Sequence, residues 1–103
     1  YIESPAGVGF SIASKPEDLI FSDEKVTNDN LGALLSFFEK FPELKSKDLY
    51  ISGESYAGVY IPFFADKILN YNLQSTEEDK INIKGVLIGN GVTDLSVDTE
   101  ASL

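Results

Sequence analysis

The sequence predicts an α/β fold in which parallel strands alternate with helices. Two short apolar runs, at 48–52 and 81–89, are typical of buried strands. Two other segments, at 31–41 and 57–68, repeat apolar residues every three or four positions, as an amphipathic helix does. With a strand tail at Tyr1-Ile2, the order becomes strand, helix, strand, helix, strand. That order implies parallel pairing through crossover helices, with both faces of the sheet covered.

The first half of the chain is expected to supply a loop and the first helix. After the strand tail the sequence is glycine-rich, and residues 11–27 are polar and indicate a surface loop. We expect Thr27 or Asn28 to be the N-cap of the first helix, because short polar side chains accept hydrogen bonds from free helical N–H groups. The helix should stop near Pro42, because proline lacks an N–H group and disfavours a helical residue before it.

The second half of the chain is expected to contain the second helix and the last strand. The helix at 57–68 contains Pro62, which either lies in the first turn of a restarted helix or kinks a continuous one. Residues 70–80 are polar and predict a loop, and the strand at 81–89 follows it. About three strands are thus expected, which leaves open edges on the sheet. We therefore expect residues 1–103 to be an internal segment of a larger domain.

Composition excludes several functional classes. The 103 residues contain 17 acidic and 8 basic residues, all lysine, giving a formal charge of −9 that disfavours nucleic-acid binding. Without cysteine, no disulfide or thiolate metal site can form. No apolar run approaches the length of a membrane span. The acidic run at 77–79 lacks the alternating spacing of a calcium loop, so we expect no metal and no cofactor.

The stretch Gly53-Glu-Ser-Tyr-Ala-Gly58 places a serine between glycines, after a predicted strand and before a predicted helix. This context is typical of the nucleophile elbow of α/β-hydrolases, a turn so tight that its serine adopts strained backbone angles. Serine needs a base for attack, usually histidine, and the chain contains no histidine. The alternative is that Ser55 only caps the following helix.

Three blocks of sequence together resemble the serine carboxypeptidase family, which includes lysosomal cathepsin A and yeast carboxypeptidase Y. The blocks span residues 3–11, 53–62 and 89–94, and they begin Glu3-Ser-Pro, Gly53-Glu-Ser and Gly89-Asn-Gly. The intervening segments follow the family pattern as well, so the resemblance covers essentially the whole chain. Ile12 departs from the pattern, because tyrosine is usual there.

The resemblance implies a partial α/β-hydrolase core in which Ser55 is the nucleophile and the Tyr56 N–H is one donor of the oxyanion hole. Gly53 and Gly58 would keep the turn small. The aspartate and histidine of the triad would come from other parts of the parent polypeptide. Asp94 follows the last strand and could be taken for the triad acid, but the family's acid lies much later in the chain.

The resemblance also implies a role for Glu54 in binding the terminal carboxylate of a peptide. Two carboxylates can share a hydrogen bond only when one is protonated, so such binding favours acidic conditions. The alternative is that Glu54 is an exposed glutamate favoured by its position at the start of a helix.

The function expected from the resemblance is that of a serine-type carboxypeptidase, which removes C-terminal residues from peptides through an acyl-enzyme on Ser55. An acyltransferase with the same triad and a non-catalytic structural or protective member remain as alternatives. The expected compartment is lysosomal, vacuolar or secretory. We expect the isolated segment to be inactive, because it lacks the base and the rest of the sheet.

Overall fold

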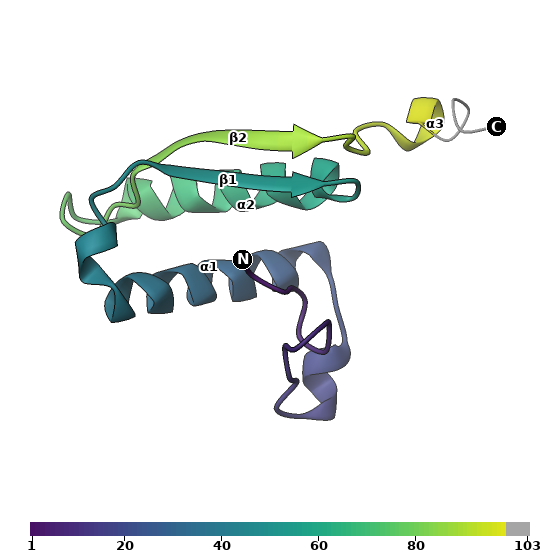
Figure 1. The fold of residues 1–103 in the computed structure, drawn as a ribbon, viewed down its shortest axis with the longest axis horizontal. Coiled ribbons are helices and arrows are strands. Elements are labelled where there is room, and N and C mark those ends of the chain that lie inside the picture. Colours follow the sequence, from purple (N-terminus) through teal and green to yellow (C-terminus); the bar gives the residue numbers. More distant parts are fainter. Residues whose placement is uncertain (99–103) are drawn as a thin grey trace.

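The computed structural model describes residues 1–98 and confirms the α/β class (Figure 1). Within these residues a two-stranded parallel sheet is joined by a long helix, and a second long helix precedes it. In chain order the elements are η1 (Pro16–Leu19), α1 (Asp23–Lys40), η2 (Pro42–Leu44), β1 (Leu49–Glu54), α2 (Ala57–Gln74), β2 (Ile83–Gly89) and α3 (Leu95–Asp98).

Helix α1 begins at Asp23, so the predicted cap at Thr27 or Asn28 is wrong. The N-cap is Ser22, whose hydroxyl oxygen accepts a hydrogen bond from the Lys25 N–H at 3.1 Å. Thr27 is buried inside the helix, where its hydroxyl donates to the Asp23 carbonyl oxygen at 2.6 Å. The expected loop at 11–27 is correspondingly shorter, and the helix ends before Pro42 as predicted.

Helix α2 begins at Ala57 as predicted but continues to Gln74, so the loop expected at 70–80 is wrong over its first five positions. Asn70 and Gln74 lie on exposed positions of the same helix, while Asn72 is half-buried and Tyr71 is half-buried against the core. Pro62 lies inside this helix, so the helix is not restarted after the glycines.

The sheet pairs Ile51 with Val86 and Gly53 with Ile88. Tyr1-Ile2 is not part of it, so the third strand predicted there is wrong for residues 1–98. Within these residues β2 is the only strand that pairs with β1, so the second edge of β1 is unpaired.

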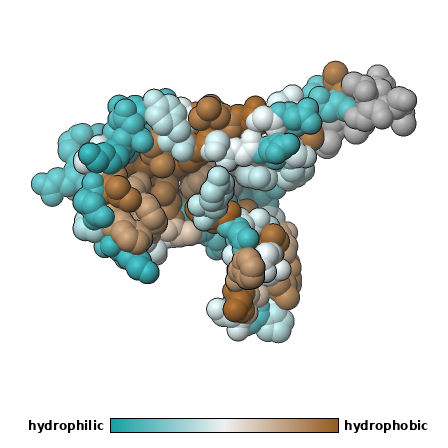
Figure 2. Space-filling model, viewed as in Figure 1, coloured by the Kyte–Doolittle hydropathy of each residue, from teal (hydrophilic) through white to brown (hydrophobic). Residues whose placement is uncertain are grey.

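Helix α2 covers only one face of the sheet, and α1 packs against α2. On the other face Tyr50 is 57% exposed and Leu87 is 56% exposed, and Figure 2 shows hydrophobic surface over the strands. The expectation that both faces are covered is therefore wrong for residues 1–98.

The core lies between α1, α2 and the covered face of the sheet. Its buried hydrophobic residues are Leu31, Leu34, Phe38, Ile51, Ala57, Ile61, Phe64, Ile68 and Ile81. Ala57 is fully buried, so the first residue of α2 is held against β1 directly behind the turn. None of the helices in residues 1–98 combines the length and the apolar character that a membrane span needs.

Asn72 ties the end of α2 to the entry of β2. Its amide N–H donates to the Ile81 carbonyl oxygen and its oxygen accepts from the Ile81 N–H, both at 2.8 Å. Because Ile81 is buried, loss of both bonds leaves its N–H without a partner within residues 1–98, while its carbonyl oxygen keeps the bond from the Ile83 N–H at 2.8 Å. We expect Asn72→Ala to lower the free energy of unfolding of the parent protein by about 2 kcal/mol.

Denaturant unfolding checks this prediction, with Asn70→Ala as the matched control. The Asn70 side chain bonds only the exposed Asp66 carboxylate within residues 1–98, so its loss should cost about 0.5 kcal/mol or less. Equal stability losses in the two variants would contradict the role assigned to Asn72.

Candidate active site

Ser55 lies on a sharp turn between β1 and α2. Strand β1 ends at Glu54 and α2 begins at Ala57, so only two residues separate the two elements. The φ angle of Ser55 is 61°, in the left-handed region that L-residues other than glycine rarely occupy, at a cost of about 1–2 kcal/mol. The serine is exposed at the carboxyl end of the sheet, where its hydroxyl can meet a substrate.

The two glycines of the turn occupy positions where a side chain would collide with its surroundings. A Cβ atom on Gly53 would lie 2.5 Å from the Ala57 Cβ. One on Gly58 would lie 2.1 Å from the carbonyl oxygen of Val92 and 2.7 Å from its backbone nitrogen. The chain after β2 therefore packs directly on the first turn of α2, and this contact needs residues without a Cβ.

Both backbone polar groups of Ser55 are hydrogen-bonded to the end of β2 or to the chain that follows it. Its N–H donates to the Gly89 carbonyl oxygen at 3.0 Å, and its carbonyl oxygen accepts from the Val92 N–H at 2.9 Å. The same carbonyl oxygen accepts from the Gly58 N–H at 3.1 Å. These bonds hold the strained residue in place from two elements.

Tyr56 follows with right-handed helical angles, φ −61° and ψ −9°, at the N-cap of α2. Among residues 1–98 the structure gives its backbone N–H no acceptor, so this donor is available beside the Ser55 hydroxyl. The Tyr56 ring lies 6.2 Å from the Tyr60 ring, centroid to centroid. A partly exposed aromatic side chain and a free amide donor therefore adjoin the serine.

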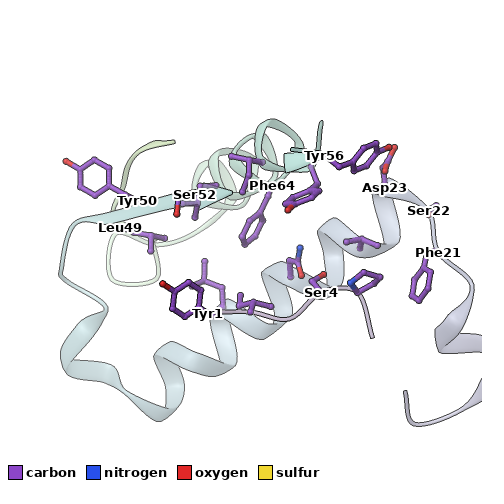
Figure 3. Close-up of a pocket in the computed structure, with 18 residues that line it drawn as sticks. Tyr1, Ser4, Phe21, Ser22, Asp23, Leu49, Tyr50, Ser52, Tyr56 and Phe64 are labelled. Carbon is purple, nitrogen blue, oxygen red and sulfur yellow. The ribbon is translucent and has the colours of Figure 1, made fainter. Parts of the chain in front are cut away.

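Two hollows flank this end of the sheet. Glu54 lines a shallow depression of about 570 Å³ together with Tyr1, Gly89 and neighbouring strand residues. The second hollow is a cavity of about 760 Å³ that lies between β1, the two long helices and the N-terminal segment. Tyr1, Tyr50, Ser52, Tyr56 and Phe64 are among the residues lining it (Figure 3).

Asp94 serves as a local cap. Its carboxylate accepts hydrogen bonds from the Ser96 hydroxyl at 2.6 Å and the Ser96 N–H at 2.9 Å, at the start of α3. The Ser96 hydroxyl bond lowers the pKa of the Asp94 carboxyl below its ordinary value. Asp98 in turn accepts from the N–H groups of Thr93 and Asp94, so these acidic groups order the segment after β2.

No group of three or more histidine, cysteine, aspartate or glutamate side chains that could hold a metal ion occurs within residues 1–98. The acidic run at 77–79 makes hydrogen bonds and ion pairs with protein side chains instead. Asp79 accepts from the Thr76 hydroxyl at 2.8 Å and from Lys45 at 3.4 Å.

Sequence reasoning missed the part that the turn after β2 plays at Ser55. The sequence indicates this block, Gly89-Asn-Gly, only through its resemblance to the family pattern. Asn90 has φ 46°, and within residues 1–98 it and Ser55 are the only non-glycine residues with positive φ. Asparagine beside glycine is the signal that could have predicted a left-handed turn there.

The whole chain, residues 1–103, matches the family model described as serine carboxypeptidase. Serine carboxypeptidase-like 42 of Arabidopsis thaliana is 53% identical over 102 residues, which cover 99% of this chain and 21% of that protein. Serine carboxypeptidase 24 of the same plant is 47% identical over 100 residues, which cover 96% of this chain and 21% of that protein.

A solved structure is similar in fold as well as in sequence. The crystal structure of Kex1(Δ)p, a prohormone-processing carboxypeptidase from Saccharomyces cerevisiae, matches with a TM-score of 0.79 and 42% identity. The match covers 89% of this chain and 21% of the yeast chain. The chain thus spans about a fifth of the length of the relatives it matches.

Proposed function

This chain belongs to the serine carboxypeptidase family, and on that premise we propose that Ser55 is the nucleophile of a serine-type carboxypeptidase. The observation that carries the proposal is the exposed Ser55 at φ 61°, on a two-residue turn between a parallel strand and a long helix. In such a turn the hydroxyl attacks the last peptide carbonyl, the peptide bond breaks to release the C-terminal residue as an amine, and water then hydrolyses the acyl-enzyme to release the shortened peptide.

The Tyr56 N–H is proposed as one donor of the oxyanion hole. It directly follows the nucleophile, has no acceptor within residues 1–98, and lies at the N-terminus of α2. Removing one such donor typically costs about 10²–10³-fold in kcat, because the developing oxyanion loses a preorganised hydrogen bond. The close packing at Gly53 and Gly58 supports the proposal, because it fixes the turn and so the direction of the Tyr56 N–H.

The general base and its supporting acid are proposed to come from polypeptide outside residues 1–103. The chain contains no histidine, and Asp94 is occupied with the start of α3. In the proposed reaction the base takes the Ser55 proton during attack and returns it to the leaving amine. The mechanism uses no cofactor.

Glu54 is proposed to bind the free carboxylate at the end of the peptide substrate. It is exposed, precedes the nucleophile, and lines the shallow depression at the carboxyl end of both strands. A carboxylate there can accept a shared proton from a substrate or enzyme carboxyl group below neutral pH. Cleavage at acidic pH would follow from this arrangement.

Substrate pairs with and without a free carboxylate test the proposed function. We expect the parent protein to release one residue from a blocked dipeptide, and Glu54→Gln to lower kcat/KM for it by about 10-fold, the scale of one hydrogen bond to a charged group. Cleavage of a blocked amino-acid ester, which has no free carboxylate, should fall much less. Initial rates with both substrates measure the difference.

The control for this experiment is Glu78→Gln, which changes an exposed glutamate in the loop after α2 and should leave both rates unchanged. If Glu54→Gln lowers kcat/KM equally for the peptide and the ester, Glu54 does not bind the terminal carboxylate. If the dipeptide is consumed only when an alcohol acceptor is added, with the acyl group transferred to that alcohol, the protein is an acyltransferase instead.

Peptides with a free C-terminus are thus the proposed substrates, and a lysosomal, vacuolar or secretory compartment is the proposed setting. Support comes from the yeast relative, which is described as prohormone-processing. Whether the protein is a carboxypeptidase or an acyltransferase, the remainder of the parent polypeptide is required, because it is proposed to supply the base.

A further inference from the structure

The four residues Gly89–Val92, here called the β2 turn, lie beside the proposed nucleophile and have no role in the proposed function above. The turn leaves the end of β2 and approaches both Ser55 and the first turn of α2. Its first residue accepts the Ser55 N–H at 3.0 Å, and its last residue donates to the Ser55 carbonyl oxygen at 2.9 Å. One short turn therefore binds both backbone polar groups of Ser55.

The β2 turn can make both bonds only because the chain bends within it. An extended strand directs alternate backbone groups to opposite sides, so Gly89 and Val92 could not both face Ser55 without a change of direction. Asn90, with φ 46°, supplies that change. Asparagine tolerates the left-handed region better than other residues with a Cβ, and β-branched residues tolerate it poorly.

Steric contacts fix the position of the turn further. A Cβ on Gly91 would lie 2.4 Å from the Ile88 Cγ2 and 3.2 Å from the Gly58 Cα. With Gly58 itself in contact with Val92, the two backbones touch without intervening side chains. The turn has little room to shift without moving Ser55.

We propose that the β2 turn positions the nucleophile, with the left-handed backbone of Asn90 as its essential feature. Asn90 is a positioning residue that acts through Ser55, because its backbone bend brings Gly89 and Val92 to that residue, whereas its side chain makes no hydrogen bond within residues 1–98. The turn holds the serine in its strained conformation, and thereby sets where the hydroxyl and the Tyr56 N–H lie in the acylation transition state. This inference rests on the proposed function of Ser55.

Substitutions at Asn90 in the full-length parent protein separate backbone from side-chain effects. Valine disfavours positive φ. We therefore expect Asn90→Val to lower kcat by about 10–100-fold, the loss that follows when a reacting group is displaced by about 1 Å. KM should change less than threefold. Glycine restores the backbone freedom without the amide, so Asn90→Gly should keep kcat within about threefold of the parent. Asn28→Val, at an exposed position of α1, is the matched control and should leave kcat unchanged.

The rate at which an organophosphonate fluoride labels Ser55 provides a second readout that needs no peptide. It should fall with kcat in Asn90→Val and recover in Asn90→Gly. If Asn90→Val does not fold, Asn90→Ala is measured by the same criteria, with an expected loss of about tenfold. Full activity in the folded valine or alanine variant overturns the proposal, and so does an inactive glycine variant, which would assign the role to the amide.

Failure of this inference is distinguishable from failure of the proposed function. If Ser55→Ala is inactive while Asn90→Val is fully active, Ser55 is the nucleophile and the turn does not position it. If Ser55→Ala keeps full activity, the proposed function itself is wrong.

Discussion

Replacing Ser55 with alanine in the full-length protein should lower kcat for peptide hydrolysis by about 10⁴-fold or more. No other group in the proposed mechanism can form the acyl-enzyme, and losses of this order follow removal of a catalytic serine elsewhere. The variant should fold normally, because alanine removes only an exposed hydroxyl. Alanine also tolerates φ 61° about as well as serine does.

Covalent labelling provides the direct measurement of this prediction. When the protein reacts with an organophosphonate fluoride, the Ser55 oxygen forms a bond to phosphorus and fluoride leaves. The serine proton passes to the general base. Mass spectrometry of the digested protein should place the adduct on Ser55, and Ser55→Ala should carry none. Ser36→Ala, at an exposed position of α1, is the control and should label fully. A folded protein with Ser55 intact and unlabelled would favour a non-catalytic member of the family.

Among single methyl groups added near the site, the one that Gly58→Ala adds should lower the stability of the protein most. The new Cβ would lie 2.1 Å from the Val92 carbonyl oxygen, far inside van der Waals contact. Because that neighbour is backbone, relief requires the turn after β2 or the start of α2 to move. We expect a loss of about 3 kcal/mol or more in the free energy of unfolding, at the upper end for an overpacked site.

The matched control for Gly58→Ala is Gly32→Ala. Gly32 lies in α1, and a Cβ there would have no atom within 4 Å. Alanine at that position should raise the free energy of unfolding by about 0.5–1 kcal/mol, because the unfolded chain loses freedom and the helix gains propensity. Denaturant unfolding measures the free energy of unfolding of both variants. A Gly58→Ala protein as stable as the Gly32→Ala protein would contradict the contact between Gly58 and Val92.

The turn at Ser55 could be predicted from sequence because its signals are local. A short apolar run, two glycines and an amphipathic segment occur within about twenty residues of one another, and the structure places strand, turn and helix there. Membership of the serine carboxypeptidase family was predictable for the same reason, since the blocks around Gly53, Gly89 and Glu3 stand in order along the chain.

The start of α1 was missed because its first turns carry few apolar residues. Periodicity becomes visible only from Leu31, whereas the helix is initiated by the Ser22 cap and buries the polar Thr27 and Asn30. Hydrophobic spacing cannot find a helix turn whose inward residues are polar.

The strand expected at Tyr1-Ile2 is wrong for a different reason. Pairing depends on a neighbouring strand, and residues 1–98 provide none on that side of β1. The contact between Gly58 and Val92 was equally beyond reach, because it joins residues 34 positions apart whose closeness depends on the packed fold.

The edge of β1 that is unpaired within residues 1–98 has a consequence for the rest of the sheet. The amides of Leu49 and Ser55 point to the β2 side, where they bond the Asn82 and Gly89 carbonyls, so by alternation those of Tyr50, Ser52 and Glu54 point to the open edge. An edge of this kind beside an apolar hollow can accept a further strand. These three amides would therefore be the donors to any strand that the parent polypeptide adds to the sheet next to the strand that leads into Ser55.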